Sequence, residues 1–272
     1  MIGTNTYLTI GMMIILGIVL PVAVSIWWVR AKKERVTTVL IGAATWFVSS
    51  QILEKIPQLV LFNPKLSIGQ AVLNNALLYT VIGALLAGVF EETGRLVAFK
   101  TLLKKRKNKE TGISHGIGHG GFEALFVLTI TGVQYLAYAS MINAGTFQDT
   151  VAQAAATGVD TSALQKIPEM LMDLTPLAGL VGIYERVFGM LLHVGLSIIV
   201  FYAVKKSKTK FYILAVILHT LFDVPAAFYQ YGTIKNIYMI EALITVYAVV
   251  SFVIIYRRLY KKDVRDDVVQ NL

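Results

Sequence analysis

The sequence predicts an all-α, polytopic membrane protein, a helical bundle of about seven spans, from its composition and from the length of its apolar runs. Hydrophobic residues make up 56% of the 272 residues and charged residues only 15%, against roughly 25% charged in a soluble domain. The apolar runs reach about 20 residues, the length that an α-helix needs to cross a hydrocarbon layer of ~30 Å. We therefore expect residues 1–272 to form a single integral membrane domain, with its polar motifs between about residues 71 and 231.

Seven apolar runs are long enough to span a membrane. They cover residues 6–29, 36–54, 71–103, 114–142, 178–204, 210–231 and 236–259. The first is too long for a signal peptide and follows no basic segment, so we expect a retained helix. The third exceeds the thickness of a bilayer, which predicts a tilt, a kink or a projection into the cytoplasm.

Two connections have a composition of their own. Residues 55–70 contain two prolines and are expected to form an interfacial or re-entrant segment, with a short eighth span as the alternative. Residues 151–174 are rich in alanine and are expected to form an amphipathic helix on the outer face.

Basic residues predict the orientation, because they occur after alternate spans. They lie in residues 30–35, 104–109, 205–210 and 257–265. Since basic connections stay in the cytoplasm, the N-terminus is expected outside and the C-terminus inside a cell membrane, as in a multi-pass protein of a bacterial plasma membrane. Topology and contact with anionic lipids then account for the net charge of +9. We expect no nucleic-acid partner.

Ionisable residues inside the predicted spans indicate a polar site. They are Glu91, Glu92, Arg95, His119, Glu123, Glu185, Arg186, His193, His219 and Asp223. A charge at the bilayer centre costs ~3 kcal/mol, so the seven carboxylates and guanidinium groups together would cost more than the net stability of a typical protein. These side chains must therefore face one another or a water-filled cavity. Counting ~1.5 Å per residue from the cytoplasmic ends of spans three, five and six places Glu92, His193 and His219 at a similar depth.

Span three carries VFEETGR, with two adjacent carboxylates. Glu91 and Arg95 are four residues apart on one helical face, while Glu92 lies about 100° round the helix. Arg95 can hold one carboxylate ionised, but two adjacent carboxylates are costly to ionise together. One of them can therefore serve as a general base. A purely structural Arg95–Glu91 pair is the alternative, and it leaves Glu92 without a partner.

Spans four and five add imidazoles and further carboxylates. In HGIGHGGFEA, His119 and Glu123 share a face, and the glycines let another helix or a substrate backbone come close. In YERVFGMLLH, His193 lies near the midplane. The adjacent Glu185 and Arg186 are expected to form a structural charge pair with other helices.

Span six contains HTLFD, in which Asp223 follows His219 by four residues and can reach its ring. This spacing serves a metal-bound or a catalytic histidine. The chain has no cysteine and lacks the H-E-x-x-H, G-x-G-D and G-x-S-x-G motifs. Its residues therefore suit activation of water by a glutamate or by a zinc ion. A proton- or cation-coupled transporter and a non-enzymatic immunity or scaffold protein remain alternatives.

The order of these motifs resembles the PrsW and YhfC families of intramembrane peptidases, distant relatives of the CAAX-processing and bacteriocin-processing membrane proteases. E-E-x-x-R in one span is followed by F-E, by E-R…H and by H-x-x-x-D in the next three spans, and HGIGHGGFEA is particularly similar to YhfC. The resemblance implies hydrolysis of a membrane-embedded or membrane-proximal polypeptide. The families have been classed as glutamic-type and as metal-dependent. CAAX-type enzymes have a histidine where Glu123 stands, so a prenylated substrate is not expected.

The resemblance also implies roles for the individual residues. Glu91 is the expected catalytic base, with Glu92 as the second choice and Arg95 setting the ionisation of both. His193 and His219 would polarise the scissile carbonyl.

In a metal-dependent enzyme, His193, His219 and Glu123 would instead bind one zinc ion, with His119 as a further candidate ligand. Asp223 would orient His219. A glutamic-type enzyme would need no metal.

Overall fold

The computed structural model describes residues 1–158 and 161–261, which contain helices and no strands. Seven of the described segments are long and apolar enough to cross a membrane: Thr4–Lys32, Val36–Leu61, Ala76–Lys100, Glu110–Ala144, Pro176–Lys205, Thr209–Tyr231 and Ile237–Tyr260. They correspond one to one with the predicted spans, so the predicted fold class is confirmed. Residues 262–265 of the last basic segment and the C-terminus lie outside the described residues, and the orientation stays a prediction.

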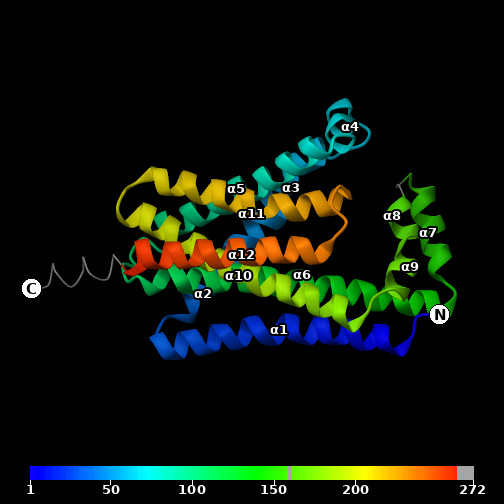
Figure 1. The fold of residues 1–272 in the computed structure, drawn as a ribbon, viewed down its shortest axis with the longest axis horizontal. Helices are drawn as coiled ribbons and strands as arrows, with labels where there is room; N and C mark the ends of the chain where they lie inside the picture. Colours follow the sequence, from blue (N-terminus) through cyan, green and yellow to red (C-terminus); the bar gives the residue numbers. More distant parts are fainter. Residues whose placement is uncertain (159–160, 262–272) are drawn as a thin grey trace, which may run out of the picture. The chain divides into compact units, whose positions relative to one another are not determined.

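The helices follow one another along the chain with short connections (Figure 1). The first five are α1 (Thr4–Lys32), α2 (Val36–Trp46), the π-helix η1 (Phe47–Leu53), α3 (Lys55–Leu61) and α4 (Ser67–Leu73). The next five are α5 (Ala76–Lys100), α6 (Glu110–Ala144), α7 (Phe147–Ala156), α8 (Ser162–Gln165) and α9 (Ile167–Met172). The last four are α10 (Pro176–Lys205), α11 (Thr209–Tyr231), α12 (Ile237–Ile255) and the π-helix η2 (Tyr256–Tyr260).

The third span is shorter than the sequence predicted, because the chain breaks before it. α5 begins at Ala76, where the Asn75 side chain accepts hydrogen bonds of 3.0 Å from the backbone nitrogens of Leu77 and Leu78. An asparagine in this position caps a helix and fixes its start. The resulting 25 residues suit a bilayer, so the tilt, kink or projection expected of a longer run is not required.

Residues 55–70 do not form an eighth span. α2 continues through η1 into α3, so the second span runs on to Leu61. The chain then turns into α4, and α3 and α4 have only 7 residues each, too few to cross a bilayer. Pro57 lies in the first turn of α3, where a proline is tolerated.

Contacts between Cα atoms divide the described chain into two compact units. The first comprises residues 1–20 and 124–184, and the second comprises residues 21–123 and 185–261. The helices α1, α6 and α10 each contribute one part to the first unit and another part to the second.

The first unit has a small apolar core around Ile10, Ala139 and Leu171, all fully buried. The hydroxyl of Thr6 donates a hydrogen bond of 3.2 Å to the backbone oxygen of Leu171. Residues 151–174 form parts of three short helices in place of the single amphipathic helix that was expected. Gly158, just after α7, has a φ of 76°, a left-handed conformation that ends a helix.

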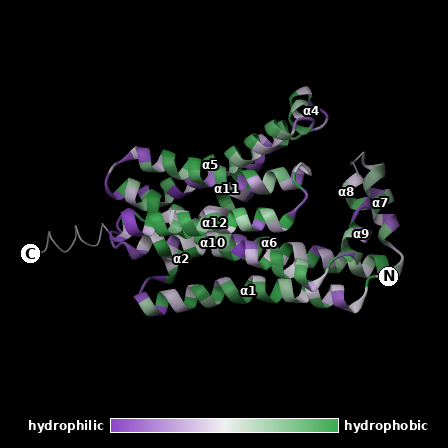
Figure 2. Ribbon diagram, in the orientation of Figure 1, coloured by the Kyte–Doolittle hydropathy of each residue, from purple (hydrophilic) through white to green (hydrophobic). Residues whose placement is uncertain are grey.

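The second unit has the larger core, in which α5 and α11 pack along much of their length. Close packing depends on glycine at Gly88, where a Cβ atom would lie 2.9 Å from the backbone oxygen of Val216. Gly120 of α6 does the same against α10, since a Cβ atom there would lie 2.9 Å from Cα of Met190. Figure 2 shows hydrophobic residues along these helices and hydrophilic residues where α10 turns into α11 and where α12 ends.

Candidate metal centre and active site

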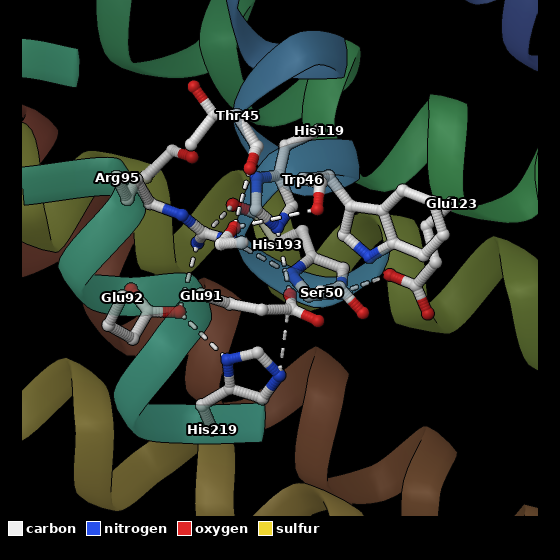
Figure 3. A network of polar contacts seen from close by, with 12 residues as sticks. Thr45, Trp46, Ser50, Glu91, Glu92, Arg95, His119, Glu123, His193 and His219 are labelled. Carbon is white, nitrogen blue, oxygen red and sulfur yellow. Dashed lines mark hydrogen bonds and ion pairs between the residues drawn. The ribbon is translucent and has the colours of Figure 1, made fainter. Parts of the chain in front are cut away.

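Ionisable side chains from four helices of the second unit form one polar network (Figure 3). α5 contributes two carboxylates and a guanidinium, α6 an imidazole and a carboxylate, and α10 and α11 one imidazole each. The residues are Glu91, Glu92, Arg95, His119, Glu123, His193 and His219. The structure thus brings together side chains that the sequence placed at a common depth.

Glu91, His193 and His219 lie at the centre of this network. One ligand atom from each, a carboxylate oxygen and two ring nitrogens, lies within 4.8 Å of the others. All three side chains are buried, with 5%, 3% and 3% of their surface exposed. The two histidines proposed as metal ligands therefore meet, and the carboxylate grouped with them is Glu91, where the sequence had indicated Glu123.

His219 is oriented by a carboxylate that the sequence had not paired with it. Its Nδ1 lies 2.8 Å from Oε1 of Glu92, and its Nε2 lies 3.9 Å from Oε2 of Glu91. The expected contact with Asp223 exists, but it is longer, at 3.5 Å from Nε2 to Oδ2. Nδ1 of His219 thus donates its proton to Glu92, and Nε2 of the same ring faces Glu91 and Asp223.

Arg95 pairs with Glu92 and not with Glu91, which corrects the pairing that helical spacing suggested. The Nη1–Oε1 distance is 3.3 Å across an i,i+3 step, and neither side chain is exposed. Spacings of three and four both bring side chains together on a helix, so spacing alone could not decide between the two carboxylates. The ring of His219, whose Nδ1 contacts Oε1 of Glu92, completes this buried group.

Arg95 also determines the protonation of His193. Its Nη2 lies 3.1 Å from Nδ1 of His193. A guanidinium can only donate hydrogen bonds, so Nδ1 accepts, and the proton of the neutral ring is on Nε2. That nitrogen lies 2.6 Å from Oε2 of Glu123, whose other oxygen accepts from Nη1 of Arg186 at 2.8 Å. Arg186 contacts Glu185 as well, as expected for a structural charge pair.

His119 supports Glu91 within the network. Its Nε2 lies 2.9 Å from Oε2 of Glu91, and its ring centroid lies 4.9 Å from that of His193. Nδ1 of His119 is buried and has no hydrogen-bond partner among the described residues. His119 thus contacts the carboxylate of the central group and lies outside the group itself.

A cavity of about 430 Å³ opens onto one side of the network. Its walls include all three members of the central group, and also Glu123, Asp223, Glu185 and Arg186. Glu92, Arg95 and His119 do not line it, and their side chains are fully buried.

Sequence reasoning missed the contribution of the second span to this cavity. It is lined by Ser50 of η1, by Gln58 of α3 and by Glu54, which lies between these two helices. The signal was available, because Glu54 is a carboxylate at the end of an apolar run. The π-helix itself has no sequence signature that we would recognise, although such turns are frequent at functional sites.

The central group fits a divalent metal ion. Two imidazoles and one carboxylate form the ligand set of several catalytic zinc sites, which leave one coordination position open. A ligating histidine normally donates its second ring N–H to a carboxylate, which is the arrangement of His219 and Glu92. The donor chemistry of the group and the hydrogen bond between His219 and Glu92 therefore both suit zinc.

Comparison with known proteins identifies the family. Residues 13–244 match the family described as YhfC intramembrane metalloprotease. The chain belongs to the YhfC family. A relative in Bacillus subtilis strain 168, the "Uncharacterized membrane protein YhfC", is 31% identical over 236 residues, which cover 87% of this chain and 90% of the relative. No solved structure matches this YhfC-family chain. The resemblance read from the motifs and the membrane location are thus confirmed.

Proposed function

We propose that this YhfC-family protein is an intramembrane metalloendopeptidase that hydrolyses a membrane-embedded or membrane-proximal polypeptide. The observation that carries the proposal is the buried group of Glu91, His193 and His219, whose ligand atoms lie within 4.8 Å of one another in the wall of a polar cavity. The family name supports a metal-dependent protease, and hence a polypeptide as the substrate.

These three residues are the proposed metal ligands. When bound there, a divalent ion such as zinc supplies Lewis-acid chemistry, which polarises a carbonyl group and activates water. A ligating imidazole carries no proton on its metal-binding nitrogen. To bind through Nε2, His193 would therefore have to carry its proton on Nδ1 instead of facing Glu123 with it, and Arg95 would have to release Nδ1.

Glu92 acts in this proposal as a positioning residue. It is fully buried and does not line the cavity, so neither water nor substrate can reach it. Its carboxylate accepts the Nδ1 proton of His219 and is held in place by Arg95. Glu92 thereby fixes the tautomer that leaves Nε2 of His219 free to bind.

Glu123 is the proposed general base. It lines the cavity, and its Oε2 is 2.6 Å from the ring of His193, so it lies beside the central group without belonging to it. Arg186 holds its other oxygen and favours the ionised form. Glu123 then accepts a proton from the attacking water and returns it to the leaving amine as the peptide bond breaks.

The decisive experiment measures metal content and cleavage on the same purified protein. We expect about one zinc per chain by elemental analysis and cleavage of an internally quenched peptide in detergent. 1,10-Phenanthroline should abolish cleavage, and added zinc should restore it. Glu91→Gln should lower both zinc content and cleavage. Glu169→Gln, an exposed glutamate of the first unit, is the matched control and should change neither.

Three results would contradict the proposal. Full cleavage by metal-free protein would indicate a glutamic-type enzyme. Flux of ions or solutes in proteoliposomes without peptide cleavage would indicate a transporter. The third result has two parts: neither the wild-type protein nor Glu91→Gln cleaves the peptide, and cells that carry Glu91→Gln keep the wild-type phenotype. It would indicate a non-enzymatic role.

A further inference from the structure

The polar cavity extends far beyond the proposed metal ligands. Residues of α3, α5 and α11 line this extension. Along each helix the lining residues recur every three or four positions, which shows that each helix lines it with one face. The residues that define it are Glu54, which directly precedes α3, Gln58 of α3, Gly83 and Ala87 of α5, and Ala227 and Gln230 of α11. We call this part of the cavity the Glu54 groove.

The groove has the length of a short extended peptide. Along α11, Gln230 is eleven positions after His219, a distance of roughly 16 Å at ~1.5 Å per residue. An extended chain advances ~3.3 Å per residue, so about five residues fit in this length.

Small side chains leave space in the groove for a polypeptide backbone. A Cβ atom added to Gly83 would meet only the ring of Phe62, at 3.8 Å, which is an ordinary van der Waals distance. Gly189 of α10 also lines the cavity, and a Cβ atom there would meet nothing within 4 Å. The cavity therefore has free space beside these two glycines.

The charges in the cavity favour a cationic occupant. Glu54 is only 5% exposed, its Oε1 accepts from Gln58 at 2.6 Å, and its Oε2 has no partner among the described residues. Arg186 is the one lysine or arginine among the described residues that line the cavity, and Glu123 and Glu185 already hold it. The adjacent Lys55 contacts Gln58 at 3.0 Å and does not line the cavity. A buried carboxylate without a paired cation is costly, and a basic ligand would relieve that cost.

We propose that the Glu54 groove binds about five extended residues of the substrate and holds a lysine or arginine side chain against Glu54. The proposal rests on the proposed peptidase function and adds to it a substrate class, an extended polypeptide segment with a basic residue close to the scissile bond. Gln58 and Gln230, which each offer an amide donor and acceptor, would hydrogen-bond the substrate backbone.

Binding can be tested separately from cleavage, because the chain contains no cysteine. Gly83→Cys, in the zinc-loaded full chain in detergent, should react with a maleimide, since it faces the cavity. Gly182→Cys is the matched control: a Cβ atom there also meets nothing within 4 Å, but the residue does not line the cavity.

The probes are three ten-residue peptides that are identical except for a central lysine, leucine or glutamate. The lysine peptide should protect Gly83→Cys from the maleimide at about tenfold lower concentration than the leucine peptide, as expected for one hydrogen bond to a charged group. Adding Glu54→Gln should remove that difference, and Gly182→Cys should not be protected.

The outcomes separate this proposal from the peptidase function. Equal protection by the three peptides, protection by none, or no labelling of Gly83→Cys would each overturn the groove proposal, whatever the cleavage activity. Selective protection by the lysine peptide without any cleavage would support the groove and contradict the peptidase function.

A second variant tests the same groove by blocking it. Gly83→Leu should fold, because leucine favours a helix over glycine and the space is open. We expect unchanged zinc content and at least tenfold slower peptide cleavage, with Gly182→Leu as the control at wild-type rate. Wild-type cleavage by Gly83→Leu would contradict binding in the groove.

Discussion

The two compact units are built from similar hydrophobic helices and differ in what they bury. Among the described residues of the first unit, the buried polar side chains are those of Thr6 and Thr9. The second unit buries carboxylates, imidazoles and a guanidinium: Glu34, Glu54, Glu91, Glu92, Arg95, His115, His119, His193, His219 and Glu241. Buried ionisable side chains, which are costly in a bilayer, are thus concentrated in the second unit.

α6 shows the same difference within a single helix. Its first part, up to residue 123, carries His115, His119 and Glu123, whereas residues 124–144 contain no acidic, basic or histidine residue. A membrane helix can therefore combine a segment that carries ionisable side chains with one that carries none. If the two units are also separate in function, substitutions in the first unit should change stability alone.

Loss of a proposed metal ligand should have the largest effect. His219→Ala removes one of the three ligating side chains, so zinc content and peptide cleavage should both fall by more than the roughly 10–100-fold that loss of an outer-shell partner causes. Elemental analysis and a cleavage assay measure the two effects. Tyr135→Phe in the first unit is the control, and retention of zinc and activity by His219→Ala would refute the ligand assignment.

Breaking the buried ion pair should have the next largest effect. Arg95→Met leaves the fully buried Glu92 without its cation, which should lower the free energy of unfolding by about 3–5 kcal/mol. Denaturant titration in detergent micelles measures this. Lys109→Met breaks a pair with Glu110 that is 3.9 Å long and partly exposed, and it should cost less than about 1 kcal/mol. An equal loss of unfolding free energy in the two variants would show that burial does not increase the contribution of the ion pair to stability.

Glu92→Gln should weaken metal binding without removing a ligand. A neutral amide replaces the carboxylate that accepts from His219 at 2.8 Å, so zinc affinity should fall roughly 10–100-fold. Competition with a fluorescent zinc chelator measures the change. Glu110→Gln, which contacts Tyr260 and no residue of the central group, should keep wild-type affinity. An unchanged affinity for Glu92→Gln would exclude its positioning role.

The smallest effect is expected in the first unit. Thr6→Val removes the hydrogen bond to the backbone of Leu171, which should cost about 1 kcal/mol of unfolding free energy and leave zinc content and cleavage unchanged. Thr157→Val, at an exposed position, should cost less. A loss of cleavage in Thr6→Val would show that the two units are coupled.

Much of the fold was predictable because hydrophobic length is a local property. Each of the seven spans matches one described segment. The differences lie at the end of the second span, which runs on to Leu61, before the third span, where Asn75 starts a new helix, and in residues 151–174, which contribute to three short helices. The meeting of His193 and His219 also followed from the sequence, since both lie at a similar depth. The partner of Arg95 did not, because Glu91 and Glu92 are both within its reach on the helix.

The sequence alone determined that the chain crosses a membrane about seven times, and that its buried charges have to compensate one another, because hydrocarbon tolerates neither short helices nor isolated ions. Only the tertiary structure decided which carboxylate joins the two histidines, which one orients His219, and that the second span completes the cavity with Glu54. Those choices depend on the rotation and packing of neighbouring helices, which bring together side chains far apart in the sequence.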